Sequence, residues 1–176
     1  MAEEKRVLLV VDLQTALLDD EPYCGDAVLQ RVSRLITRCR EQGVEVIYVR
    51  HDGGVGDELE YGTPGWEIAD AIAPLPEEGI IDKRVNSAFR GTGLSAYLDE
   101  HKVKSIILVG MQTEYCIDAT CKSAFERGYE VTIPQGAFTT YDNNWLSGEK
   151  LNEFYTHIWN GRFAKILPFE EVIQSL

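Results

Sequence analysis

Basic residues are scarce in this chain of 176 residues. Lysine and arginine together number 17 against 29 aspartate and glutamate residues, which gives a formal net charge of −12 at pH 7. Nucleic acids and anionic membranes are bound through basic patches, so this balance argues against both as partners. It does not argue against a small-molecule substrate, because a local site can differ in sign from the whole surface.

Long hydrophobic runs are also absent from the start of the chain. The first apolar run, residues 7–11, has five members and follows the acidic opening "MAEEKR". Five residues are too few for a secretory core or for a membrane span. We therefore expect a cytoplasmic protein with no membrane partner.

Paired cysteines are a third absence. The four cysteines, Cys24, Cys39, Cys116 and Cys121, form no C-x-x-C motif and stand at no zinc-binding spacing from a histidine. In a reducing compartment we expect free thiols rather than disulfides.

Short apolar runs alternate with helical periodicity along the whole chain. Strands are predicted over residues 6–12, 44–50, 79–82, 105–110, 129–134 and 164–168, and helices over residues 26–43, 93–102, 116–127 and 147–161. The glycine-rich segment 51–68 is predicted to be irregular. This order predicts an α/β fold, a single-domain doubly wound parallel sheet with helices on both faces, spanning residues 1–176.

Ligands of such sheets bind outside the carboxyl ends of the strands. Asp12 ends the first predicted strand, His51 and Asp52 follow the second, Lys83 follows the third, and Cys116 follows the fourth. A cysteine at the start of a helix is expected to have a lowered pKa, because the helix amino terminus carries partial positive charge. Each residue also has a plainer interpretation: Asp12 as a turn cap, Lys83 as part of a solvated loop, and Cys116 as a small buried hydrophobe.

Three segments resemble those of the isochorismatase-like cysteine hydrolases, a family that includes nicotinamidases and N-carbamoylsarcosine amidases. They are "LLVVDLQTALL", "DKRVNSAFRGTGL" and "VGMQTEYCIDATCKSAFERGYEV", in the family's order. The resemblance implies that Asp12, Lys83 and Cys116 are catalytic. It also implies an oxyanion hole of the Gln112 and Cys116 backbone N–H groups, a cis peptide bond between Met111 and Gln112, no cofactor, and a homo-oligomer.

The chemistry of these groups predicts hydrolysis of a C–N amide bond in a small molecule. Asp12 is the candidate base because no suitably placed histidine is evident, and Lys83 beside both groups would favour the thiolate. Cys116 would attack the carbonyl carbon, and water would release the acyl group from a thioester. One alternative is hydrolysis of the isochorismate vinyl ether, which needs no thiol. Another is a non-catalytic binding protein on the same fold.

Histidine is too scarce for the metal site of the family's metal-binding nicotinamidases. Only His51, His101 and His157 are present, and the last two lie in predicted helices, so we expect no metal. The candidate substrate-binding residues are Gln14, His51, Tyr61, Trp66, Phe89 and Tyr115, with Trp145 as a further aromatic. Core or subunit packing is an equally good explanation of the aromatic members.

Overall fold

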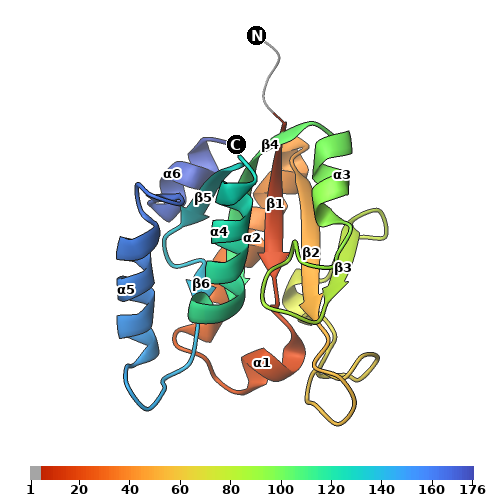
Figure 1. Ribbon diagram of the computed structural model, residues 1–176, viewed down its shortest axis with the longest axis vertical. Coiled ribbons are helices and arrows are strands. Elements are labelled where there is room, and N and C mark those ends of the chain that lie inside the picture. The colour runs from red at the N-terminus through yellow and green to blue at the C-terminus, as the bar shows by residue number, and fades with distance from the viewer. Residues whose placement is uncertain (1–4) are drawn as a thin grey trace.

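A seven-stranded sheet runs through the middle of the molecule, with helices on both faces (Figure 1). The computed structural model describes residues 5–176, so residues 1–4 of the predicted domain lie outside the described part. The strands are β1 (Lys5–Val11), β2 (Glu45–His51), β3 (Gly79–Lys83), β4 (Val103–Met111), β5 (Glu130–Pro134), β6 (Phe138–Thr139) and β7 (Lys165–Leu167). Their order is β3-β2-β1-β4-β5-β7, with β6 paired to β4, and the paired strands are parallel. The predicted α/β fold with a parallel sheet is confirmed.

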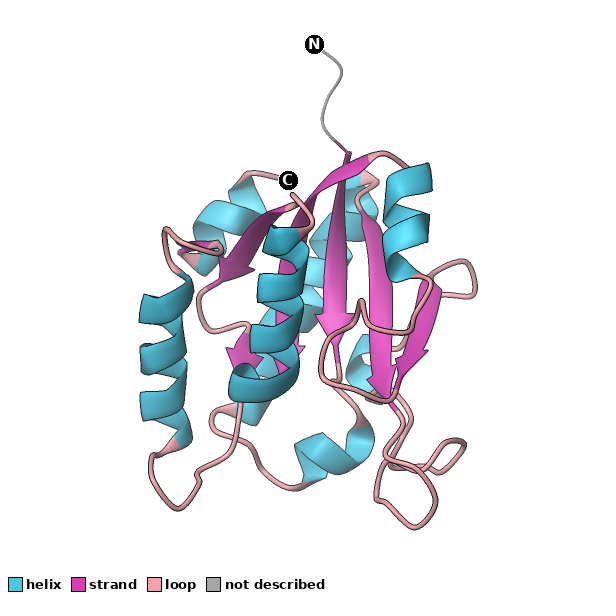
Figure 2. Cartoon of the chain, viewed as in Figure 1, coloured by secondary structure: helices cyan, strands magenta, loops and turns pink. Residues whose placement is uncertain are grey.

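Helices lie on both faces of the sheet (Figure 2). Their buried side chains belong to two hydrophobic cores, one on each face. The helices are α1 (Thr15–Asp19), α2 (Gly25–Gln42), α3 (Leu94–Glu100), α4 (Asp118–Glu126), α5 (Gly148–Trp159) and α6 (Phe169–Gln174), with single turns η1 (Asp70–Ile72) and η2 (Thr113–Ile117). Buried side chains of α3, α4 and α5 share one core, and those of α1, α2 and α6 share the other. None of the helices within residues 5–176 has both the length and the apolar character that a membrane crossing requires.

Strand β1 lies inside the sheet and contributes side chains to both hydrophobic cores. Val7, Leu9 and Val11 enter one core, whereas Leu8 and Val10 enter the other, and all five are at most 1% exposed. Burying an aliphatic side chain of this size stabilises the fold by roughly 1.5–3 kcal/mol. The continuous apolar run is therefore the sequence signature of a strand that is covered on both faces.

Several short elements were not predicted. Helices α1 and α6 have five and six residues, too few for helical periodicity to show in the sequence. The strand β6 and the turn η1 are shorter still. The predicted start of the helix over residues 116–127 is wrong: α4 begins at Asp118, and a π-helical turn, η2, precedes it.

The carboxyl ends of β1 and β4 approach each other unusually closely. A Cβ atom on Gly110 would lie 1.9 Å from the carbonyl oxygen of Val11, and Gly110 has φ of +127°, a backbone conformation that other residues rarely adopt. Asp12, the residue that follows the last residue of β1, also has a positive φ, of 52°. Asp12 thus leaves the strand on a turned backbone, beside the end of β4.

Candidate active site

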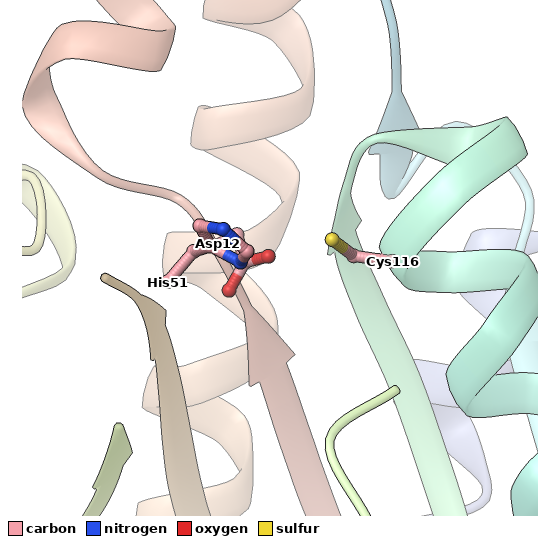
Figure 3. Close-up of side chains that lie close together, drawn as sticks. All are labelled: Asp12, His51 and Cys116. Atoms are coloured by element: carbon pink, nitrogen blue, oxygen red, sulfur yellow. The ribbon is translucent and has the colours of Figure 1, made fainter. Parts of the chain in front are cut away.

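Four predicted site residues meet at the carboxyl edge of the sheet. Asp12 follows β1, His51 ends β2, Lys83 ends β3, and Cys116 lies in η2, directly after β4. Neighbouring parallel strands end at the same edge, and the register pairs His51 with Lys83 across β2 and β3. Figure 3 shows the side chains of Asp12 and His51 facing Cys116 across the gap between their elements.

The ammonium group of Lys83 lies at the centre of this group. Its Nζ atom is 2.7 Å from Oδ2 of Asp12, 3.2 Å from Sγ of Cys116 and 3.1 Å from Nδ1 of His51. An ammonium group has three protons to donate, so these three acceptors account for all of them. Lys83 and Asp12 are only 3% and 1% exposed, which makes this a buried ion pair.

The second carboxylate oxygen of Asp12, Oδ1, is not used in the contact with Lys83. Oδ1 is buried and has no hydrogen-bond partner among the described residues. A buried carboxylate oxygen without a donor is costly, so such an atom is typical of a site that acts on a proton. The Asp12 carboxylate lies close to the thiol, because one of its oxygens, a ring nitrogen of His51 and Sγ of Cys116 are all within 4.8 Å of one another.

The expectation of a lowered thiol pKa is wrong. Burial and then the nearby Asp12 carboxylate raise the pKa of Cys116 to about 12, and the Lys83 ammonium opposes them only in part. Cys116 is 8% exposed, and it does not stand at the first turn of a regular α-helix. The raised pKa favours the protonated thiol, which lies beside the Asp12–Lys83 salt bridge.

His51 is held in place by Gln14. The side-chain amide of Gln14 donates to the carbonyl oxygens of His51 (3.0 Å) and Trp66 (2.8 Å), and its own oxygen accepts from the His51 backbone N–H (2.8 Å). Gln14 is fully buried, so it is placed to position His51 rather than to contact a substrate as predicted. Burial, and then the Lys83 ammonium, lower the pKa of His51, which favours the neutral imidazole that can accept from Lys83.

The backbone around the thiol includes the predicted cis peptide bond between Met111 and Gln112. The carbonyl oxygen of Gln112 then accepts from the N–H groups of Tyr115 (3.2 Å) and Ile117 (3.1 Å). These bonds close the η2 turn that carries Cys116. The oxyanion hole of the Gln112 and Cys116 N–H groups stays a prediction.

The predicted aromatic residues occupy very different places. Trp66 is buried under Tyr61, with ring centroids 4.5 Å apart, while Tyr61 itself is 63% exposed. Tyr115 and Trp145 are 52% and 89% exposed.

Phe89 does not fit its predicted role in substrate binding. It is 4% exposed and stacks on Tyr129, which precedes the amino end of β5. That position is at the opposite edge of the sheet from Cys116. The aromatic signal in the sequence reflected core packing at this residue.

A cavity of about 480 Å³ lies beside the end of β3, lined by residues of the segments 52–61 and 82–91. Lys83 belongs both to its lining and to the buried group around the thiol. Sequence reasoning missed Arg84 and Arg90 in this lining, and also Asn86, whose Oδ1 lies 3.9 Å from the sulfur of Cys116. The only signal for them was their position just after Lys83 in "DKRVNSAFR".

A metal ion does not suit the group of Asp12, His51 and Cys116. Its ligand atoms are close enough together for one, but Lys83 Nζ is within 3.2 Å of all three side chains and fills the place of a cation. His101 stacks on Tyr97 at the end of α3, and His157 is exposed on α5, so neither joins this group.

The parallel sheet and the buried thiol, carboxylate and ammonium at its carboxyl edge define an α/β protein with a cysteine-centred site. The model of the isochorismatase domain matches residues 6–156, and the chain belongs to the isochorismatase family.

Similar proteins include enzymes and a solved structure. The chain is 37% identical over 139 residues to a streptothricin hydrolase of Streptomyces noursei, covering 78% of this chain and 50% of the relative. It is 30% identical to nicotinamidase 3 of Arabidopsis thaliana, covering 96% and 87%. A crystal structure of an isochorismatase family protein superposes with a TM-score of 0.88 at 30% identity, covering 94% of this chain and 99% of the other. The chain spans about half the length of the streptothricin hydrolases that it matches.

Proposed function

We propose that this protein is a hydrolase that cleaves a C–N amide bond of a small molecule through a thioester on Cys116. The observation that carries the proposal is the position of Lys83, whose ammonium touches both Asp12 (2.7 Å) and Cys116 (3.2 Å) in a buried group. The streptothricin hydrolase and nicotinamidase relatives support an amide as the bond that is cut. No cofactor takes part in the proposed reaction.

The first half of the reaction forms the thioester. Because the resting thiol is protonated, the proton passes from sulfur to the unpartnered Oδ1 of Asp12 as sulfur attacks the carbonyl carbon. Lys83 stabilises the negative charge on sulfur during this transfer, and the N–H groups of Gln112 and Cys116 donate to the oxyanion. The intermediate then collapses: the C–N bond breaks, and the leaving nitrogen takes the proton from Asp12.

The second half releases the acid. Asp12, again a carboxylate, takes a proton from water as the water oxygen attacks the thioester carbon. The C–S bond breaks, and the sulfur regains its proton from Asp12. His51 takes no proton in either half. The Nδ1 atom of His51 orients the Lys83 ammonium, and the side chain of Gln14 holds the backbone of His51. His51 and Gln14 are therefore positioning residues.

Ammonia release from a panel of small amides tests the proposal. The panel begins with nicotinamide, and streptothricin is followed separately by mass spectrometry. The native protein is expected to hydrolyse at least one member, and Cys116→Ala is expected to lose at least about 10³-fold in kcat, because the nucleophile is gone. Cys121→Ala is the matched control: Cys121 is a fully buried thiol of α4, and its loss should leave the rate nearly unchanged. Equal activity of native protein and Cys116→Ala would rule out the thioester.

Vinyl ether hydrolysis, the second candidate, is favoured only by the family's name. It protonates carbon and needs no thiol, so isochorismate turnover that survives in Cys116→Ala would establish it.

The alternative of a non-catalytic binding function is tested by alkylating Cys116 with iodoacetamide. Mass spectrometry of the peptides follows the reaction. With a pKa of about 12, the alkylation rate should rise about tenfold per pH unit between pH 7 and pH 9 without a plateau. A substrate amide that protects Cys116 and is then consumed identifies the enzyme. Protection without turnover identifies the binding protein.

A further inference from the structure

The η2 turn that carries Cys116 is tied to α5 at its first residue. Thr113 is fully buried, and its hydroxyl donates to Oδ1 of Asn152 on α5 (2.5 Å). This is the only hydrogen bond that the hydroxyl makes within residues 5–176. A buried hydroxyl that loses its partner is left desolvated without a bond, so the contact favours one position of Thr113 relative to the helix.

A second hydrogen bond ties the other end of the turn to the same helix. Asp118 directly follows Ile117, the last residue of η2, and its Oδ1 accepts from the indole N–H of Trp159 (2.8 Å). Its Oδ2 accepts from Lys122 (2.8 Å). Because Trp159 is fully buried, its N–H depends on Asp118 for a partner.

Asn152 and Trp159 lie on one face of α5, because they are seven residues apart and seven residues make about two turns of an α-helix. This face therefore holds both ends of η2, with Cys116 between them. The distance of 3.2 Å from its sulfur to Nζ of Lys83 depends on where the turn lies. The side chains of Asn152 and Trp159 make no hydrogen bond to that thiol within the described chain.

We propose that Asn152 and Trp159 are positioning residues of the active site, which hold η2 and therefore the Cys116 sulfur in place. The inference rests on the proposed thioester chemistry at Cys116. Attack on a carbonyl carbon requires the sulfur, the ammonium and the carboxylate to keep their relative positions, and a displacement of about 1 Å can cost about 10²-fold in rate. Neither residue contacts the reacting atoms, so each acts only through the position of the turn.

Asn152→Ala and Trp159→Phe test the two ends of the turn in amide hydrolysis. Each variant is expected to lose roughly tenfold in kcat with KM nearly unchanged, because the sulfur is displaced while the substrate still binds. Tyr129→Phe is the matched control. It removes the hydrogen bond from Tyr129 to Asp99 (2.9 Å), at the opposite edge of the sheet, so it should lower stability without lowering kcat.

Two variants of Thr113 separate the hydrogen bond from the shape of the side chain. Thr113→Val removes the hydroxyl and should lose kcat as Asn152→Ala does, whereas Thr113→Ser keeps the hydroxyl and should retain most of the rate. The double variant Thr113→Val/Asn152→Ala should lose little more than either single variant, since all three lack the same bond. Additive losses in kcat would contradict a role of that bond in positioning the turn.

Alkylation of Cys116 by iodoacetamide tests the position of the turn without any turnover. Burial is the largest cause of the raised thiol pKa, so a displaced η2 should expose the sulfur and lower its pKa. Cys116 in Asn152→Ala and in Trp159→Phe should therefore react several-fold faster than in the native protein. Cys121, fully buried in α4, is the internal control, and its rate should not rise.

The outcome for these positioning residues is separate from that of the proposed function. Unchanged alkylation of Cys116 in both Asn152→Ala and Trp159→Phe would overturn the inference even if the native protein hydrolyses amides. An equal rise at Cys116 and Cys121 would also overturn it, because general loss of stability would then explain the exposure. A rise confined to Cys116 supports the inference even where no amide is cleaved.

Discussion

At the scale of single residues, the site depends on one buried ammonium that three acceptors share. Lys83 and Asp12 are at most 3% exposed, so neither of their charges is well solvated. A buried ion pair is only a modest source of stability, but removing one partner leaves the other charge uncompensated. The structural role of Lys83 and its proposed catalytic role can therefore be separated by removing the two charges singly and together.

The first prediction concerns Asp12→Asn, Lys83→Met and the double variant. Each single variant should lose about 3–5 kcal/mol in the free energy of unfolding, because a buried charge stays behind. The double variant should lose much less than the sum, since no charge remains. Urea unfolding measures this. All three should lose about 10³-fold or more in amide turnover. Additive destabilisation, or turnover that returns in the double variant, would contradict the shared site.

A second prediction concerns pH and His51. The pKa of His51 is lowered in the folded protein from 6.5, so below about pH 6.5 the unfolded chain binds a proton at this residue that the folded protein does not. His51 should therefore cost stability progressively as the pH falls below that value.

Urea unfolding of the native protein and of His51→Asn between pH 5 and pH 8 measures this contribution. Below about pH 6.5, the free energy of unfolding of the native protein should fall relative to that of His51→Asn. Above pH 7, the difference between the two free energies should be constant. His157→Asn is the control, because His157 is exposed on α5. The same slope in both variants would mean that His51 is not the group responsible.

At the scale of elements, the site depends on how strands end. Asp12, His51 and Lys83 come from the ends of β1, β2 and β3, and the η2 turn brings Cys116 from β4 to meet them. Strands β1, β2 and β4 were predictable because their apolar runs are buried on both faces. The η2 turn was not, since a single turn of π-helix leaves no periodic pattern in the sequence.

The third prediction concerns the contact of β4 with β1. Gly110→Ala should destabilise the fold by about 3 kcal/mol or more, because its Cβ would lie 1.9 Å from the Val11 oxygen and its φ is +127°. Gly79→Ala is the control at the start of β3, where an added Cβ meets no atom within 4 Å. It should change the free energy of unfolding by about 1 kcal/mol or less. Urea unfolding of the two variants measures these changes in the free energy of unfolding. Similar losses in Gly110→Ala and Gly79→Ala would contradict the close contact between β1 and β4.

At the scale of the whole molecule, several large apolar side chains lie outside the two hydrophobic cores and are exposed. Trp145 is 89% exposed, Phe154 55% and Leu146 41%, all within the segment 145–154 at the start of α5. Exposed apolar groups that gather in one region are typical of contact surfaces.

The fourth prediction is that the protein is a homo-oligomer that uses this segment. Light scattering coupled to size-exclusion chromatography should give more than one chain per particle, and Trp145→Ser should shift the distribution towards the monomer. Val55→Ser is the control, since Val55 is 96% exposed in the segment after β2. A native protein that is monomeric at high concentration would exclude this assembly.

The sequence by itself determined the order of the longer elements, the parallel sheet and the edge at which the candidate site residues gather. Apolar runs and helical periods are local patterns, and the parallel-sheet rule converts them into a shared edge. The tertiary structure alone decided the raised pKa of Cys116, the hydrogen bonds of Gln14 to His51 and the core position of Phe89. Those properties depend on burial and on partners that are distant in the chain, and no local pattern records them.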